Sequence, residues 1–540
     1  MPRLADSHHH RGSESSDDGF EHEKSRERHY TLWPTVSQAN RADTDGIKII
    51  EIEDDAMSQY PRKTISWEAG DPENPYNWTN KKKTYIVIVG ALSVINSTLG
   101  SSLPSNAIPF ISKAFHITSS YAQILPISMY LFGYIVGPLV FGPLSESCGR
   151  RYIMSTSFVA FTIFTLGCAV APTWEALLFN RLLAGVTASS PVAVTGGIFA
   201  DIYADPVARG RAMAAFIGAA CVGPLIAPPL SGFISPALGW RWTFWVGFVF
   251  ACVTLAPVLL LPETYGPVLL ARRAARLRKE TGSPDIVAPF DLGKEKFQIN
   301  GNSNTRPTTA NDGLGTYRSG NMSLSKSRLR NFLHVLCAYP IVFQGIYKQS
   351  PGVSGLTFLP IGVGTIGATI LFLSYDSTLR KAQALKKPWT QKEESRRLPL
   401  ACVGGPLFVV GLFWLGWTAK PQIPYYVPML AGIPSGMGFV LIFMALLNYL
   451  ADAYEIYAAS AMAAASCARS VAGALLPFAA EPMYRRLGVQ WATSVLAFLS
   501  LAVCAIPWVF LWKGDTIREG SKFCRALKEK REREAMEQGK

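Results

Sequence analysis

Eleven stretches of about 20 mostly apolar residues constrain the fold of this chain more than any other feature. A helix of that length crosses the ~30 Å hydrocarbon core of a membrane. Only 17% of the 540 residues are charged, whereas a soluble protein carries about 25%. We therefore predict an all-α polytopic membrane protein. The apolar stretches lie at 84–106, 120–142, 152–171, 174–199, 212–234, 240–261, 352–375, 399–418, 425–449, 457–480 and 489–512.

The charges between these stretches indicate the orientation of the chain. Strongly basic connections alternate with weakly charged ones, and basic connections face the cytoplasm. Tyr76 and Trp78 followed by Lys81–Lys83 form a typical interfacial anchor, so we place both termini in the cytoplasm. This distribution explains the net charge of +14 without nucleic acid as a partner. The basic connections are 150–151, 209–211, 272–279, 380–397 and the tail after 513, and Arg485 and Arg486 are an exception on the outer side.

Composition divides the chain into five regions. We predict a disordered cytoplasmic tail at 1–80 and a first six-helix bundle at 81–265. A cytoplasmic linker follows at 266–330, and its first part is a basic amphipathic helix suited to lying on the inner leaflet. The second bundle spans 331–513 and has five clear spans, and a basic cytoplasmic tail occupies 514–540.

The seventh span is short or incomplete. Cytoplasmic connections on both sides of 331–376 require an even number of crossings there, but only one good span is visible. The remaining candidate, 331–347, has about 17 residues and contains His334 and Pro340, at the lower limit for a span. Either this helix crosses the membrane poorly or the sequence lacks part of it.

Some residues inside the spans are costly in lipid. Arg181 and Arg469 each cost at least ~2.5 kcal/mol, so we expect them to face a water-filled cavity or a partner, unless they extend to the interface. In the fifth span, prolines remove backbone donors and predict a bend at a working interface, the alternative being an irregular helix. The residues concerned are Gly223, Pro224, Pro228 and Gly232.

Enzyme chemistry has no support in the pattern. Gly362–Gly367 matches a dinucleotide-binding fingerprint, but it lies inside a span and follows no strand. The spans contain neither a zinc-protease motif nor paired acidic residues at mid-depth, and the scattered cysteines are typical of small core residues. We therefore expect no enzyme activity, no cofactor and no metal.

The loop between the second and third stretches carries a motif, G-x-L-x-E-x-x-G-R-R. It resembles the corresponding loop of the major facilitator superfamily, with Glu146 in place of the usual aspartate. Arg181 and Gly185 are similar to that superfamily's fourth-span motif, and Gly223 to Gly232 are similar to its antiporter motif, with Ala227 and Ser231 where glycines are usual. With other short segments, the chain looks like the fungal 12-span drug:proton antiporters, which include polyamine and azole exporters. The loop residues are Gly142, Leu144, Glu146, Gly149, Arg150 and Arg151.

This resemblance implies two six-helix bundles around a central cavity that opens alternately to each side. Glu146 and the loop arginines would then act as a gate, the alternative being that they only fix topology. The cavity and substrate candidates are Asn96, Arg181, Asn448 and Arg469. No carboxylate lies at mid-span in a clear helix, so the proton-coupling candidates are Glu146 and Asp201 at the cytoplasmic edge.

The resemblance implies proton-coupled export of small organic compounds by a monomer in the lipid bilayer. The small number of acidic residues near Arg181 favours drug-like amphipathic compounds over polyamines. The plasma membrane is the expected location, with the vacuolar membrane as the alternative. Two other functions stay open: a non-transporting truncated product that lacks a full seventh span, and a transporter-like membrane sensor.

Overall fold

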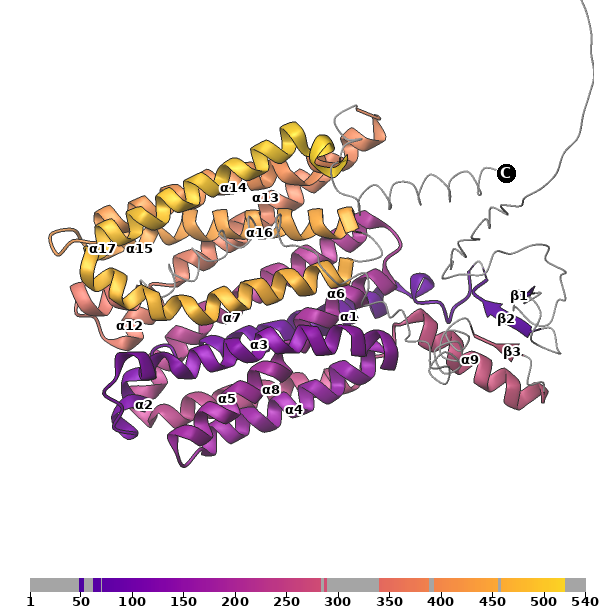
Figure 1. Ribbon diagram of the computed structural model, residues 1–540, viewed down its shortest axis with the longest axis horizontal. Helices are drawn as coiled ribbons and strands as arrows, with labels where there is room; N and C mark the ends of the chain where they lie inside the picture. The colour runs from indigo at the N-terminus through magenta and orange to yellow at the C-terminus, as the bar shows by residue number, and fades with distance from the viewer. Residues whose placement is uncertain are drawn as a thin grey trace, which may run out of the picture.

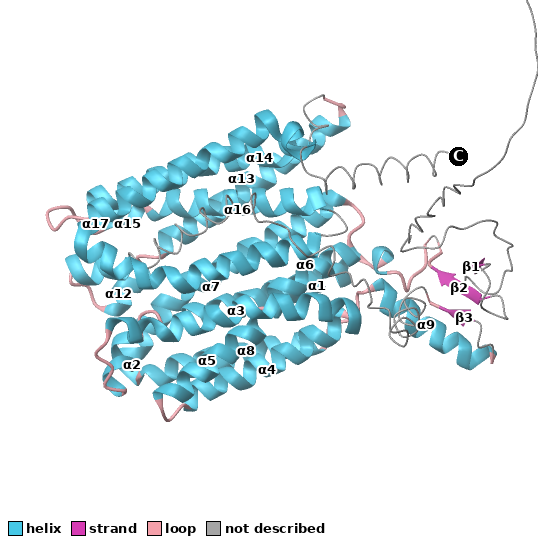
Figure 2. Ribbon diagram, viewed as in Figure 1, coloured by secondary structure: helices cyan, strands magenta, loops and turns pink. Residues whose placement is uncertain are grey.

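The computed structural model describes residues 48–52, 62–68, 70–282, 286–288, 339–387, 393–454 and 458–519. Long helices lie side by side and form most of the molecule (Figure 1). The three strands and helix α9 lie beyond one end of these helices (Figure 2). The basic segments and α9 are at that end, so we call it the cytoplasmic end and the opposite one the extracellular end, following the predicted orientation.

The first bundle contains the helices that follow the N-terminal segment. The fourth span consists of two helices, α5 and α6, which meet at Ser189. Ser189 is the C-cap of α5 and the N-cap of α6. A short helix, α2, crosses the extracellular end between the first two spans. The helices are α1 (Asn80–Ser102), α2 (Ile108–Ala114), α3 (Ser120–Cys148), α4 (Arg150–Val170), α5 (Trp174–Ala188), α6 (Ser190–Ile202), α7 (Pro206–Leu238) and α8 (Trp240–Leu259).

The second bundle begins, among the described residues, with a π-helical turn at Ile341–Ile346. Residues 331–338, about half of the predicted seventh span at 331–347, lie outside the described residues. The helices that follow are α12 (Pro351–Leu356), α13 (Leu359–Ala384), α14 (Glu393–Thr418), α15 (Tyr426–Leu430), α16 (Gly432–Tyr454) and α17 (Ala458–Glu519).

Helix α17 contains the last two predicted spans, 457–480 and 489–512. Gly488 within it has a φ of +72°, a conformation that other residues rarely adopt. Beyond Gly488, the Trp491 ring makes an edge-on contact with Trp417 at the end of α14, while Cys504 lies against Gly405 nearer the start of α14. The second half of α17 therefore runs antiparallel to α14 and returns to the cytoplasmic end.

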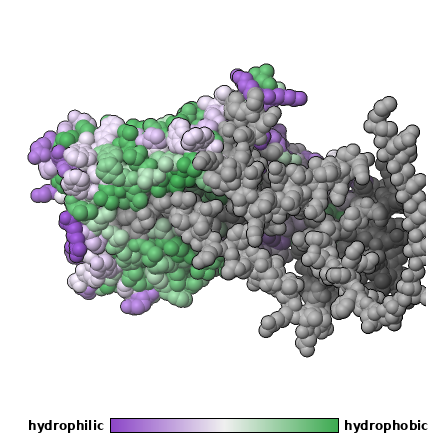
Figure 3. Space-filling view, turned by 45° about the horizontal axis from the view of Figure 1, so that its top comes forward, coloured by the Kyte–Doolittle hydropathy of each residue, from purple (hydrophilic) through white to green (hydrophobic). Residues whose placement is uncertain are grey.

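Ten helices among the described residues are long and apolar enough to cross a membrane. Their outward side chains form a green apolar surface along the helices, and polar residues gather at the extracellular end (Figure 3). Exposed residues such as Val253 and Phe498 belong to this surface. Such an apolar surface is stable in lipid, and the helices pair their backbone groups internally, as a membrane requires. The predicted all-helical membrane fold is therefore confirmed.

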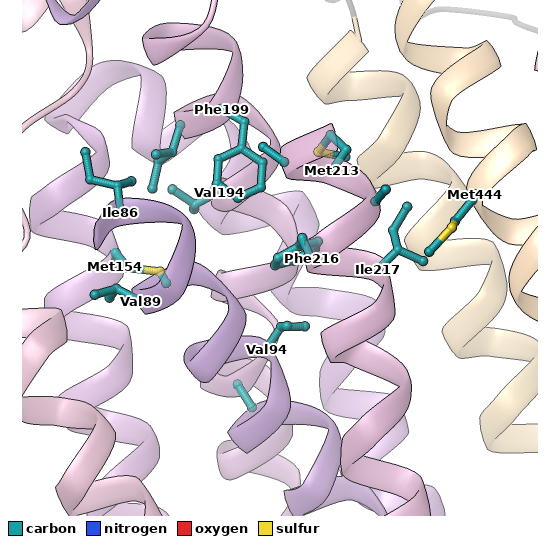
Figure 4. Close-up of a cluster of buried hydrophobic side chains, with 14 of the residues drawn as sticks. Ile86, Val89, Val94, Met154, Val194, Phe199, Met213, Phe216, Ile217 and Met444 are labelled. Carbon is teal, nitrogen blue, oxygen red and sulfur yellow. The ribbon is translucent and has the colours of Figure 1, made fainter. Parts of the chain in front are cut away.

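One buried apolar cluster joins the two bundles. Met213, Phe216 and Ile217 of α7 pack in it with Met444 of α16 (Figure 4). Ala368 and Phe372 of α13 belong to the same cluster. The two halves thus share a packed interface rather than a loose contact.

A small sheet lies at the cytoplasmic end and changes the expected description of the tail. Strands β1 (Lys48–Ile52) and β2 (Arg62–Ser66) are antiparallel, and β3 (Ile286–Val287) from the linker pairs parallel to β2. The segment that we expected to be wholly disordered therefore contains two strands and a short helical turn at Pro75–Asn77.

Helix α9 (Gly266–Thr281) packs on this sheet. Its Ala274 is buried against Ile65 and Ile286, and Leu270 and Leu277 contact the same cluster. The apolar face that we expected to lie on the inner leaflet is therefore used, at least in part, by the sheet. Ion pairs from the helix to Asp71 and Glu73 hold the N-terminal segment to the linker; they involve Arg273 and Arg276.

Candidate functional site

The loop motif forms the start of helix α4. Gly149 has a φ of +99°, and an added Cβ would lie 2.5 Å from Oε2 of Glu263, so only glycine fits. The buried Glu263 carboxylate accepts hydrogen bonds from the backbone N–H groups of Arg150 (2.9 Å) and Arg151 (3.3 Å). It also accepts from the N–H groups of Thr264 and Tyr265. Glu263 thus stabilises the positive end of the α4 dipole.

Arg150 is the centre of a buried polar group. Its Nε donates to Oδ2 of Asp201 at 3.2 Å, and its Nη1 donates to the Ser145 hydroxyl at 2.7 Å. Its guanidinium lies 4.9 Å from the centre of the Tyr265 ring. Burial, and then the Glu146 carboxylate, raise the pKa of the Tyr265 phenol, so Tyr265 remains a neutral hydrogen-bonding group. This network belongs entirely to the first bundle.

In the part of the chain that the structure describes, the other loop side chains, those of Glu146 and Leu144, form no hydrogen bond to this network, although Glu146 lies near Tyr265. The side chain of Glu146 is exposed, and no ion pair of Glu146 is found among the described residues. Leu144 is exposed as well, and an added Cβ on Gly142 would meet nothing within 4 Å. Of the two proton-coupling candidates, Asp201 is therefore the one that contacts the loop arginines.

Arg181 is almost fully buried within the first bundle, with 2% of its surface exposed. Its guanidinium donates to the carbonyls of Gly100 (2.8 Å) and Ser101 (3.3 Å), and to that of Pro126 (2.7 Å). It also lies 4.4 Å from the centre of the Tyr130 ring. The carbonyls of Gly100 and Ser101 are in the last turn of α1, where they have no partner within the helix. Arg181 therefore satisfies the end of α1, and the structure places it away from open space.

Small residues bring α3 and α5 close together beside Arg181. An added Cβ on Gly185 would lie 2.0 Å from the carbonyl oxygen of Tyr130, and one on Gly133 would lie 2.3 Å from that of Leu182. Small residues allow this approach of helix backbones in membranes. Gly185 of the fourth-span motif thus serves packing.

The two asparagine candidates are also buried. The Asn96 amide donates to the carbonyl of Phe250 (2.9 Å) and to Oγ1 of Thr254 (2.5 Å), both on α8. Asn96 therefore faces the interior of its own bundle. Asn448 donates to the Met444 carbonyl of its own helix, and its Oδ1 would lie 3.6 Å from a Cβ on Gly210 of α7. Of these two residues, Asn448 is the one at the bundle interface.

Arg469 lies at the bundle interface as well. Its Nη2 donates to the Ser466 hydroxyl at 3.2 Å, and its guanidinium lies 5.3 Å from the centre of the Phe443 ring. It interacts electrostatically with Tyr134 of α3 and Cys221 of α7. Arg469 is partly exposed, unlike Arg181, although it is far from either end of its span.

The glycines and prolines of α7 close the extracellular end. An added Cβ on Gly232 would lie 2.4 Å from the carbonyl oxygen of Pro351, the first residue of α12. The Asn106 amide donates to the carbonyls of both Pro228 and Pro351. The Asn106 amide thus bridges α7 and the start of α12. Nearer mid-span, Gly223 approaches Thr98 and Leu99 of α1 instead.

Asp376 of α13 is a site residue that the sequence reasoning missed. Its buried carboxylate accepts from Nε of Arg211 on α7 at 3.2 Å, and Nε of Arg380 lies 3.5 Å away. The pair with Arg211 joins the two bundles at the cytoplasmic end. A signal was present: Asp376, Arg380 and Lys381 repeat the spacing of Glu146, Arg150 and Arg151 after the corresponding span of the other half.

Comparison with known proteins identifies the family. A family model described as "Major Facilitator Superfamily" matches residues 90–477. The chain belongs to the major facilitator superfamily. It is 37% identical over 471 residues to the "MFS-type transporter penM" of Penicillium rubens, covering 85% of this chain and 90% of that protein. It is 36% identical over 464 residues to the "Major facilitator superfamily multidrug transporter mdrA" of Aspergillus fumigatus, covering 85% of this chain and 75% of that protein.

Two further comparisons, with an efflux pump and with a solved structure, agree with this family. The "Efflux pump FUBT" of Fusarium oxysporum is 36% identical over 463 residues, which cover 84% of this chain and 76% of that pump. Among solved structures, the proton:xylose symporter XylE has a TM-score of 0.59 and 17% identity, covering 80% of this chain and 97% of that one. The structural likeness establishes the fold of this transporter-family member and nothing about its substrate.

Proposed function

We propose that this chain exports small organic compounds across a membrane by alternating access. The support from sequence is that multidrug transporters and efflux pumps are similar to it over most of its length. The proposal favours drug-like amphipathic compounds over polyamines, because the charged side chains at mid-depth of the bundle interface are basic.

One observation carries the mechanism: different contacts join the bundles at their two ends. At the extracellular end, α7 and α12 touch through their backbones at Gly232 and Pro351. At the cytoplasmic end, the Arg211–Asp376 ion pair joins α7 and α13. Alternating access requires that each set of contacts can break while the other holds. Helix α7 takes part in both, so a tilt of α7 against the second bundle would open one end and close the other.

Proton coupling is the finer part of the proposal. A coupling carboxylate must sit where burial and a movable cation set its protonation state. Asp201 and Asp376 are both largely buried carboxylates with an arginine Nε at 3.2 Å, from Arg150 and Arg211 respectively. Exposed Glu146 lacks such an environment, so we assign Glu146 to orientation of the loop rather than to coupling. We further propose a monomer in the plasma membrane with both termini in the cytoplasm.

Efflux from whole cells tests this proposal. Cells of a yeast strain that lacks its own drug exporters, with and without the chain, are loaded with rhodamine 6G, a cation, or with fluorescein, an aromatic anion delivered as its diacetate. Export of at least one dye should appear only with the chain, and it should stop when a protonophore removes the proton gradient. Correctly inserted protein without any export of either dye or of a panel of neutral drugs would favour the sensor or the non-transporting product instead.

A further inference from the structure

Four side chains from four spans meet near the middle of the membrane. Tyr134 lies 14 residues from each end of α3, and Phe443 lies 11 residues from each end of α16. Cys221 lies 15 residues after the start of α7, and Arg469 lies 11 residues after the start of α17, about 17 Å along the helix. Two of these spans belong to each bundle. The cluster therefore occupies the bundle interface at the depth where transporters of this architecture bind substrates.

The charge of Arg469 is not balanced by an acid in this cluster. In the part of the chain that the structure describes, the ionisable groups near Arg469 are the Tyr134 phenol and the Cys221 thiol, which are both neutral in their ordinary form. Among the described residues, no Asp or Glu forms an ion pair with Arg469. Its hydrogen bond to Ser466 and its contact with the Phe443 ring supply no negative charge. A guanidinium at this depth needs polar partners, because an isolated charge in low dielectric is costly. Arg181 donates to three backbone carbonyls, whereas Arg469 donates, within the same described residues, to the Ser466 hydroxyl alone.

The surroundings of Arg469 also have a defined shape. The Phe439 and Phe443 rings are stacked, with centres 5.8 Å apart and an angle of 10° between their planes. Both rings are partly exposed, as is Arg469. The Tyr134 hydroxyl contacts the Ser97 hydroxyl, so the Tyr134 ring is held in the first bundle, within the buried apolar cluster against which both phenylalanines pack. A flat apolar ring with one acidic group would match this set, because the ring can lie along the phenylalanines while its carboxylate accepts from the guanidinium.

We propose that Arg469 binds the negative charge of the transported substrate, and that this carrier takes planar aromatic anions in preference to neutral or cationic compounds. The proposal rests on the export function proposed above and names its substrate class. A bidentate contact between guanidinium and carboxylate fixes the orientation of the substrate as well as its charge. Tyr134 and Cys221 of the first bundle lie near Arg469, so an anion bound at Arg469 would lie between the two halves.

A matched pair of ligands tests this inference on the purified full-length protein in lipid nanodiscs. 2-Naphthoate and 2-naphthalenemethanol share one ring system and differ in charge. Isothermal titration should show naphthoate binding at least ~10-fold more tightly than the alcohol, the factor that corresponds to about 1.4 kcal/mol. Arg469→Gln should bring the two affinities together by weakening naphthoate binding alone, whereas Arg469→Lys should retain part of the preference. Arg486→Gln removes an exposed positive charge from the same helix and should change neither affinity.

Equal binding of the two ligands by the wild-type protein would overturn the inference, and this result does not depend on any variant being folded. A preference for naphthoate that persists in Arg469→Gln would overturn it as well. The export function is judged separately in cells: rhodamine 6G export without any preference for naphthoate leaves export standing and removes the anion site. Absence of export of every compound, naphthoate included, removes the export function itself.

Discussion

Replacing Gly232 by alanine should hold the extracellular end open. The new Cβ would lie 2.4 Å from the carbonyl oxygen of Pro351 and 2.7 Å from its carbon, whereas ordinary contacts begin at 3.4 Å. The shortfall is therefore about 1.0 Å, and both atoms are backbone, so they cannot rotate away. Overpacking of this kind costs ~1–3 kcal/mol. The gain in helix propensity from glycine to alanine applies to open and closed states alike and cancels.

This cost falls on the closed state alone, so the population should shift about 5- to 150-fold towards an open extracellular end. Spin labels at Leu238 on α7 and Val353 on α12 report the opening, because both positions are exposed. Double electron–electron resonance, in a background without native cysteines, should show a longer distance between the two labels in Gly232→Ala than in the protein with Gly232. Export by Gly232→Ala should also be slower.

The matched control is Gly218→Ala. Gly218 is also on α7 and faces the second bundle, but an added Cβ would lie 3.5 Å from Oγ1 of Thr369, which is an ordinary contact. Its distance distribution should equal that of the wild type. An unchanged distribution in Gly232→Ala, or an equal shift in both variants, would refute the steric reasoning.

Three further predictions follow from the contacts of single side chains. Arg181→Met should lower the yield of folded protein, because the last carbonyls of α1 lose their hydrogen-bond donor, and Arg181→Lys should recover part of the yield. A normal yield of Arg181→Met without export would instead support a role of Arg181 in the cavity. Glu263→Gln should lower thermal stability in detergent by about 1–2 kcal/mol through loss of charge at the α4 N-terminus. Glu175→Gln removes an exposed carboxylate from the first turn of α5 and should cost less, because Glu263 is buried and accepts from four backbone N–H groups. A double-mutant cycle on Arg211 and Asp376 should give a coupling free energy of about 0.2–1 kcal/mol in stability, which is small because the Arg211 side chain is 42% exposed. A coupling of zero would mean that this pair does not help to close the cytoplasmic end.

The apolar stretches predicted the membrane fold because lipid permits few alternatives. Twenty apolar residues in a row have to form a helix whose backbone is paired internally. The same logic flagged Arg181, since a charge in a span needs a partner. The pattern did not reveal that this partner is the end of α1, because backbone carbonyls have no sequence signature.

Contacts between distant segments were beyond the sequence. Strand β2 pairs with β3 more than 200 residues later, and neither strand is long enough to show a clear alternation. Asp376 was missed for a different reason: the apolar run ends at 375, so the carboxylate was counted as part of the loop. The helix continues to Ala384 and places Asp376 inside it, opposite Arg211. Its repeated spacing with Arg380 was readable, but its partner on α7 required the fold.

The central claim is export driven by a proton gradient, and transport by purified protein tests it most directly. Proteoliposomes containing the full-length chain, with the pH inside and outside set independently, should move the dye that cells export, rhodamine 6G or fluorescein, against its gradient only when a pH difference is imposed. Asp376→Asn should bind the dye as the wild type does but lose the dependence on the pH difference. Dye movement that ignores the pH difference in the wild type would contradict coupling, and no movement under any gradient would contradict export.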